Sequence, residues 1–147
     1  MAAERIFVAL DLEMTGHDPE QDEIIQIGAV KFTQTRVLGR WGTLVRPKVK
    51  LPFRIARLTG INPNDLNKAP VFDAVKDKLR SFVGDHPIVG HSIGNDLSFL
   101  AKQGLALDNP SLDTWELAML LMPSLNAYSL QGVASALGVS VDNHHDA

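Results

Sequence analysis

Hydrophobic residues in the first half of the chain gather in short unbroken runs, a pattern typical of strands that are covered on both faces. The first run ends at Asp11, and the next two flank the polar residues 33–36, which predict a hairpin turn. Two shorter runs follow later in the chain. The expected strands are residues 6–10, 24–32, 37–45, 87–90 and 111–113. The first three strands should therefore form an antiparallel meander.

Apolar residues in the second half recur at helical spacing instead. Phe72, Val75 and Leu79 share one face of a segment that Gly84 follows, and Ser129 is placed to cap the last helix. Residues 46–70, which several prolines interrupt, are expected to be mostly loop with one helical turn near 55–58. The expected helices are 71–83, a segment around 97–101 that Gly104 stops, 114–121, and a last one from Ser129 through Leu137.

A meander followed by alternating strands and helices predicts an α/β fold with one mixed five-stranded sheet and helices on both faces. The chain has no linker, repeat or low-complexity tract, so residues 1–147 are expected to form a single domain. Chemistry in such sheets gathers at the carboxyl ends of the parallel strands. The residues that follow Leu10, Gly90 and Leu112 are therefore the first candidates for a site.

Composition narrows the class of protein further. The chain has 147 residues, is 45% hydrophobic and 21% charged, and contains no cysteine. Disulfides and thiolate metal clusters are thereby excluded, which leaves carboxylates and histidines as possible metal ligands. No apolar stretch approaches the length of a membrane span and no signal peptide is evident, so we expect a cytoplasmic location and no membrane partner.

The net charge of -3 conceals an uneven distribution of charge. Residues 31–57 carry eight of the fourteen basic residues and none of the seventeen acidic ones. The basic residues of this segment are Lys31, Arg36, Arg40, Arg46, Lys48, Lys50, Arg54 and Arg57. Such a segment suits a polyanionic substrate, and it equally suits solvated strand edges on which cations discourage edge pairing.

Asp11 and Glu13 stand two residues apart at the end of the first predicted strand. If the chain stays extended there, both side chains project from the same face. Two carboxylates in one small space favour a hard divalent cation such as Mg²⁺. The alternative is an ordinary acidic pair on a solvated surface.

Three further polar residues follow later strands, and each has a structural explanation as well as a functional one. Asp96 offers a third carboxylate, but an acid near a helix start also complements the helix dipole. His91 could equally be a hydrogen-bonded structural histidine. For Asp113 we favour a structural role as the cap of the helix that follows.

Taken in order, these features resemble the DEDDh group of 3′-5′ exonucleases, which have the ribonuclease-H-like fold. Residues 11–16 (Asp-Leu-Glu-Met-Thr-Gly) are similar to the first motif of the group, and residues 91–100 to its second motif, with Asp96 in register. Residues 58–61 (Leu-Thr-Gly-Ile) resemble the segment that proofreading members place against the terminal nucleotide. The pattern from 46 to 60 is closer to the polymerase III epsilon type and to the exonuclease domains of DinG-type helicases.

The resemblance implies hydrolysis of single-stranded DNA from its 3′ end to nucleoside 5′-monophosphates, with two Mg²⁺ or Mn²⁺ ions about 3.5–4 Å apart. It implies that Asp11 bridges the ions, that Glu13 holds the ion on the attacking side, and that Asp96 supports the second ion. His145 would be the general base. The residues implied in nucleotide binding are Leu12, Met14, Thr15, Gly16, Leu58, Thr59, Gly60, Ile61 and His91. A fused or associated polymerase or helicase is the implied partner, in replication or repair.

Residues 145–147 (His-Asp-Ala) match only the first three positions of the third motif, His-x-Ala-x-x-Asp. The sequence as given lacks the final aspartate and the last helix, so we expect it to be the N-terminal part of a longer protein. Two alternatives remain open. Residues 13–16 (Glu-Met-Thr-Gly) resemble the oligoribonuclease branch, which acts on short RNA. The missing ligand is compatible with an inactive nucleic-acid-binding module.

Overall fold

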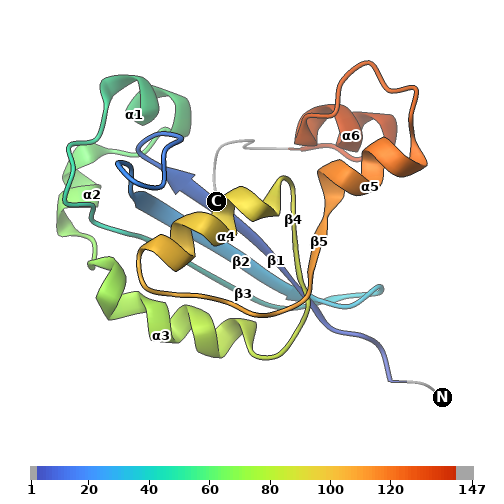
Figure 1. The fold of residues 1–147 in the computed structure, drawn as a ribbon, viewed down its shortest axis with the longest axis horizontal. Helices are drawn as coiled ribbons and strands as arrows, with labels where there is room; N and C mark the ends of the chain where they lie inside the picture. The colour runs from blue at the N-terminus through green and yellow to red at the C-terminus, as the bar shows by residue number, and fades with distance from the viewer. Residues whose placement is uncertain (1–2, 142–147) are drawn as a thin grey trace.

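Five strands form one mixed sheet in the order β3-β2-β1-β4-β5 in the computed structural model, which describes residues 3–141 (Figure 1). The strands are β1 (Phe7–Met14), β2 (Ile24–Phe32), β3 (Val37–Leu44), β4 (Ile88–Gly90) and β5 (Ser111–Asp113). β1, β2 and β3 pair antiparallel, whereas β4 pairs parallel with β1, and β5 parallel with β4. The predicted meander followed by parallel strands is confirmed.

Within residues 3–141, six helices connect and flank the strands. They are α1 (Phe53–Thr59), α2 (Pro63–Lys68), α3 (Phe72–Val83), α4 (Ile93–Lys102), α5 (Thr114–Leu121) and α6 (Leu130–Ala136). α3 and α5 match their predicted bounds to within one residue, and the Ser129 side chain caps α6 by accepting from the Gly132 N–H. No helix in the described part of the chain is long and apolar enough to cross a membrane.

The prediction that residues 46–70 are mostly loop is wrong, because this segment forms α1 and α2. α1 ends at Gly60, whose φ of 72° lies in the left-handed region that glycine adopts without cost. Asn62 then caps α2 through its side chain. Ile61 and Leu66 are buried against Ile25 of β2 in a small second core. This packing against the sheet stabilises two helices that are too short to be predicted from periodicity.

The first strand is also longer than predicted, since it continues through Asp11 and Glu13 to Met14. Pairing with β2 holds it extended, with Asp11 opposite Gly28 and Glu13 opposite Gln26. Backbone pairing does not depend on side-chain polarity, so the end of the apolar run did not mark the end of the strand.

The main core lies on one face of the sheet. Val8, Leu10 and Leu12 of β1 are buried there, and α3 and α4 pack against them (Figure 1). The buried helix residues include Val75 and Leu79 of α3, and Phe99 and Leu100 of α4. Asp11 and Glu13 alternate with these strand residues and so project from the other face, where they are exposed and half-buried.

Asp113, the last residue of β5, caps α5 as predicted. Its Oδ1 accepts hydrogen bonds from the Trp115 N–H at 2.8 Å and from the Ser92 N–H at 2.9 Å. Ser92 precedes α4 and has a φ of 56°. One carboxylate therefore satisfies a backbone donor at the start of both α4 and α5.

Replacing Asp113 with alanine is expected to destabilise the protein by about 1–2 kcal/mol, because two backbone donors lose their acceptor. Urea unfolding followed by circular dichroism would measure this difference. Asp113→Asn keeps an acceptor oxygen and should lose much less. Equal loss in Asp113→Ala and in the exposed Asp108→Ala would contradict the capping role.

Candidate active site at the carboxyl end of beta strand 1

The predicted carboxylates meet where β4 stops alongside β1. β4 pairs with β1 only at Val8 and Ala9, so no strand faces the backbone of Leu12 on that side. Asp96, in the first turn of α4, fills this place, and its Oδ1 accepts the Leu12 N–H at 3.1 Å. Leu12 lies between Asp11 and Glu13 in sequence, so the carboxyl groups of Asp11, Glu13 and Asp96 lie near one another.

Asp96 is a buried acid, only 6% exposed. Burial and the nearby negative charges of Asp11 and Glu13 raise its pKa to about 7, against the lowering effect of the hydrogen bond from Leu12. The main cause is burial, which disfavours the charged form, and Asp11 comes next. The site thus holds more negative charge than the protein alone stabilises.

This donor set suits a divalent cation by its chemistry. Oxygen ligands from carboxylates are what Mg²⁺ and Mn²⁺ prefer, and a cation would offset the like-charge repulsion that adds to the effect of burial on the pKa of Asp96. Among residues 3–141, however, no group of three or more His, Asp or Glu side chains is spaced to enclose a metal ion. The predicted base, His145, lies outside the described residues.

The loop that follows β1 is fixed by its own hydrogen bonds. Thr15 is buried, and its hydroxyl donates to Asp22 Oδ1 and accepts from the Glu23 N–H, both at 3.0 Å. The other Asp22 oxygen accepts from the Asp18 N–H. A Cβ at Gly16 would overlap the Asp22 carboxylate, which these bonds hold in place. The geometry therefore gives Thr15 and Gly16 a role in shaping the loop beside the carboxylates.

The predicted nucleotide-seating segment, residues 58–61, forms the end of α1. Leu58 is 49% exposed, whereas Ile61 is buried in the second core. Thr59 Oγ1 donates to the Ile55 carbonyl and accepts from the Ile61 N–H. Leu58 is thus the member of the segment whose apolar side chain is offered to solvent.

Both ring nitrogens of His91 have partners within the protein. Nε2 lies 2.7 Å from the Tyr128 carbonyl oxygen, and Nδ1 lies 2.9 Å from Thr114 Oγ1. Because a carbonyl can only accept, Nε2 donates to Tyr128, and Nδ1 is paired with the Thr114 hydroxyl, which also lies 3.3 Å from the Gly90 carbonyl oxygen. This is the structural alternative considered for His91, and it links β4 to α5 and to the loop before α6.

Glu23 is a residue that sequence reasoning missed. Its Oε2 accepts from the backbone N–H groups of Lys48 and Val49, at 2.6 and 2.9 Å, and its carbonyl accepts from the Thr15 N–H. It therefore ties the basic segment to the loop after β1. Nothing in the spacing of residues 23 and 48 signals this contact, because it depends on the pairing of β2 with β3.

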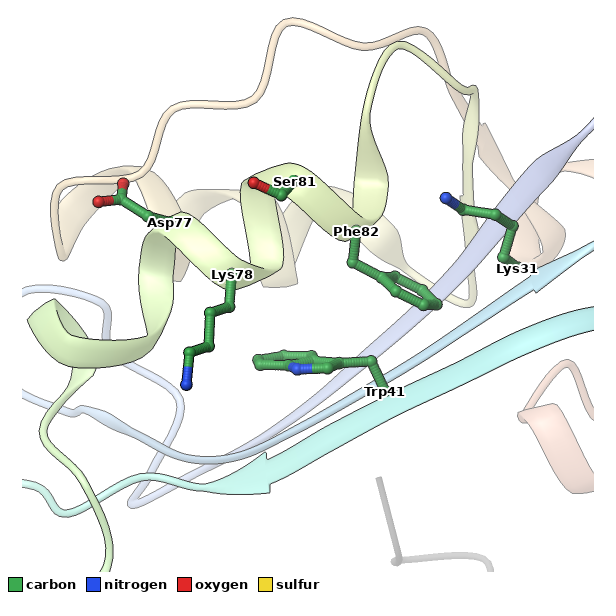
Figure 2. A pocket seen from close by; sticks show the side chains of 6 residues that line it. All are labelled: Lys31, Trp41, Asp77, Lys78, Ser81 and Phe82. Carbon is green, nitrogen blue, oxygen red and sulfur yellow. The ribbon is translucent and has the colours of Figure 1, made fainter.

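A separate open groove lies on the core side of the sheet, between α3 and the strands β2 and β3 (Figure 2). Lys31 Nζ stands 4.9 Å above the centre of the Phe82 ring at one end of it, and the ring of Trp41 lies along its floor. The lining residues are Lys31, Trp41, Asp77, Lys78, Ser81 and Phe82. None of them belongs to the predicted site.

A comparison with known families agrees with this fold. The family described as exonuclease (RNase_T) matches residues 8–147, which is nearly the whole chain, and the chain is therefore a member of the exonuclease family.

The named relatives include those that the motifs resemble. The chain is 40% identical to a PolC-type DNA polymerase III of Clostridium perfringens and 37% identical to the DNA polymerase III subunit epsilon of Aquifex aeolicus. It is 32% identical to the 3′-5′ exonuclease DinG of Staphylococcus haemolyticus. Each match covers 96% of this chain, but only 10%, 72% and 16% of the respective relative.

Solved structures share the fold at low sequence identity. E. coli exonuclease I in complex with a dA16 oligonucleotide has a TM-score of 0.81 and 20% identity, over 98% of this chain and 38% of that one. Exonuclease X in complex with 5′ overhanging duplex DNA has a TM-score of 0.76 and 20% identity, over 92% and 75%. The predicted ribonuclease-H-like architecture and the resemblance to epsilon and DinG exonucleases are confirmed.

The raised pKa of Asp96 predicts how the metal-free protein responds to pH. A carboxyl whose folded-state pKa lies above its unfolded value of about 4 loses its contribution to stability as the pH rises from about 4 through about 7. Asp96→Asn keeps an oxygen for the Leu12 N–H without the charge. In EDTA at pH 8 this variant should therefore be more stable than the wild type, by on the order of 1–4 kcal/mol.

Melting curves between pH 4 and pH 8 would show the gap between wild type and Asp96→Asn widening as the pH rises. Asp65→Asn, an exposed acid on α2, is the matched control and should show no such gap. A variant less stable than the wild type at pH 8 would contradict this account of the burial cost.

Proposed function

We propose that this chain is the catalytic domain of a DEDDh-type 3′-5′ exonuclease that acts on single-stranded DNA and uses two Mg²⁺ or Mn²⁺ ions. The observation that carries the proposal is the buried Asp96 carboxylate bonded to the backbone between Asp11 and Glu13. Membership of the exonuclease family gives this acidic site its chemical context. Asp11, Glu13 and Asp96 are the residues that would hold the cations.

Divalent ions held there supply neutralisation of the phosphodiester charge and activation of the attacking water. In the proposed reaction, water oxygen bonds to the phosphorus of the terminal phosphodiester, and the bond from that phosphorus to the 3′ oxygen breaks. His145 is the proposed acceptor of the water proton, a role that suits a side chain with an ordinary pKa of about 6.5. The leaving 3′ oxygen takes a proton from solvent, so that the products are a nucleoside 5′-monophosphate and a strand with a new 3′ hydroxyl.

The substrate side of the proposal rests on α1 and on the loop after β1. Leu58 offers an exposed apolar surface for the terminal nucleotide. The other residues proposed in the nucleotide site are Leu12, Met14, Thr15, Gly16, Thr59, Gly60, Ile61 and His91. Among them the buried Thr15 and the doubly bonded His91 would act by positioning backbone and loops.

DNA is favoured over RNA because the matched relatives include DNA polymerase III proteins and DinG, and exonuclease I is solved with a DNA oligonucleotide. The chain spans about a tenth of PolC-type relatives, so a fused or associated polymerase or helicase remains our proposal for its partner. The cytoplasmic location and the single-domain organisation remain predictions.

Digestion of a 5′-labelled single-stranded DNA in Mg²⁺ or Mn²⁺ tests the reaction. A ladder that shortens from the 3′ end is expected, and EDTA should abolish it. Asp11→Ala should reduce the rate by at least roughly a hundredfold, because a proposed shared ligand is lost, while removing a like charge near Asp96 leaves the fold as stable or more so. Asp65→Ala removes one exposed acid elsewhere and should keep wild-type activity.

Two other outcomes would favour the alternatives. Preferential cleavage of a short RNA in competition with a long DNA strand would favour an oligoribonuclease. Binding of DNA without hydrolysis in either metal would favour a nucleic-acid-binding module.

A further inference from the structure

Within the basic segment of residues 31–57, α1 carries exposed side chains that have no role in the proposed catalytic site. Phe53, the first residue of α1, is 77% exposed, an unusual environment for a phenylalanine. The Arg57 guanidinium carbon lies 5.9 Å from the centre of its ring. Since Arg57 covers one side of the ring at most, the exposure of Phe53 leaves a large aromatic surface open to a ligand.

Four exposed side chains make up one face of α1. At about 100° per residue, Phe53, Arg57, Arg54 and Leu58 follow one another around the helix within an arc of about 140°. The other side of the helix, with Ile55, is half-buried and packs against the second core. We call these four residues the α1 face. It presents an aromatic ring and two guanidinium groups next to Leu58, which is proposed to seat the terminal nucleotide.

Packing and hydrogen bonds fix α1 at one end of the sheet. Ile55 packs against the cluster of Ile25, Ile61 and Leu66, and the Gly60 N–H closes α1 on the Ala56 carbonyl. The loop before α1 is held by Glu23, which accepts hydrogen bonds from the backbone N–H groups of Lys48 and Val49. Figure 1 shows α1 next to the loop that follows β1, at the end of the sheet where Asp11 and Glu13 lie.

The charge of the face is available to a ligand. The two salt bridges found within residues 3–141 join Lys76 to Asp73 and Lys102 to Glu20, so neither involves the basic segment. Glu23 contacts the segment through backbone N–H groups and not through its lysine side chains. An aromatic ring flanked by unpaired cations fits a stacked nucleobase with phosphates on either side.

We propose that the α1 face binds the nucleotides of a single strand that precede the 3′-terminal one, with a base stacked on Phe53 and a phosphate at Arg54. This inference rests on the proposed function, because it assumes that the terminal nucleotide lies at Leu58. It extends the binding site to residues that take no part in hydrolysis, and it assigns the basic segment a ligand.

Binding can be tested separately from catalysis. The probe is a ten-nucleotide oligothymidylate with a 5′ fluorescein, and fluorescence anisotropy is measured in EDTA, where no hydrolysis occurs. Phe53→Ala should weaken binding roughly tenfold, since stacking on an aromatic ring contributes strongly to single-strand affinity. Phe53→Trp keeps an aromatic ring and should bind the oligothymidylate about as tightly as the wild type. Phe53→Leu is apolar but has no ring, and it should bind as weakly as Phe53→Ala. Arg54→Gln should lower the slope of log affinity against log salt by about 0.7.

Two controls separate stacking from a general loss of surface. Leu120→Ala on α5 removes an apolar side chain that is also 77% exposed and should leave affinity unchanged. With an oligonucleotide of abasic sites, wild type and Phe53→Ala should bind equally. Circular dichroism would verify the fold of each variant.

The proposal is overturned if the wild type does not bind the oligothymidylate, or if Phe53→Leu or Phe53→Ala binds as tightly as the wild type. A Phe53→Ala variant that binds DNA normally but dissociates an oligomer in sedimentation would assign the α1 face to a protein interface. Tight, ring-dependent binding by a chain that hydrolyses no DNA would retain the α1 face and reject the exonuclease.

Discussion

The site depends on one hydrogen bond, from the Leu12 N–H to the buried carboxylate of Asp96. β4 ends before it reaches Leu12, and an unpaired backbone donor beside the core would be costly. Asp96 resolves this by projecting from α4 into the place of a strand. The solution brings a buried negative charge next to Asp11 and Glu13, and the raised pKa of Asp96 records the cost. The end of a short strand thereby creates a site that favours a cation.

Much of this fold could be predicted from the sequence because its strands are short apolar runs and its longer helices have clear faces. The bounds of β2, α3 and α5 follow from such local patterns, as does the capping role of Asp113. α1 and α2 could not be predicted in this way, because their stability comes from Ile61 and Leu66 packing on a residue of β2. The continuation of β1 past Asp11 depends likewise on pairing with β2.

The acidic residues of the candidate site were predicted by type and order, but their arrangement was not. Asp96 and Leu12 are 84 positions apart, and only the parallel pairing of β1 with β4 brings α4 to the end of β1. Similarly, the roles of Thr15 and Gly16 depend on Asp22. The Thr15 hydroxyl bonds to the Asp22 carboxylate, and a side chain at Gly16 would overlap that carboxylate. The motifs therefore predict which residues belong to the candidate site, but not the contacts that each of them makes.

An acidic site and a basic segment within one small domain would ordinarily neutralise each other. Here the connection between them is made by Glu23, which binds the backbone N–H groups of Lys48 and Val49 rather than a basic side chain. Arg57 rests over an aromatic ring and pairs with no acid in the described residues. The cations of α1 can hold a polyanion while its phosphodiester approaches the carboxylates of β1 and α4. Without such cations, repulsion between like charges would oppose this approach.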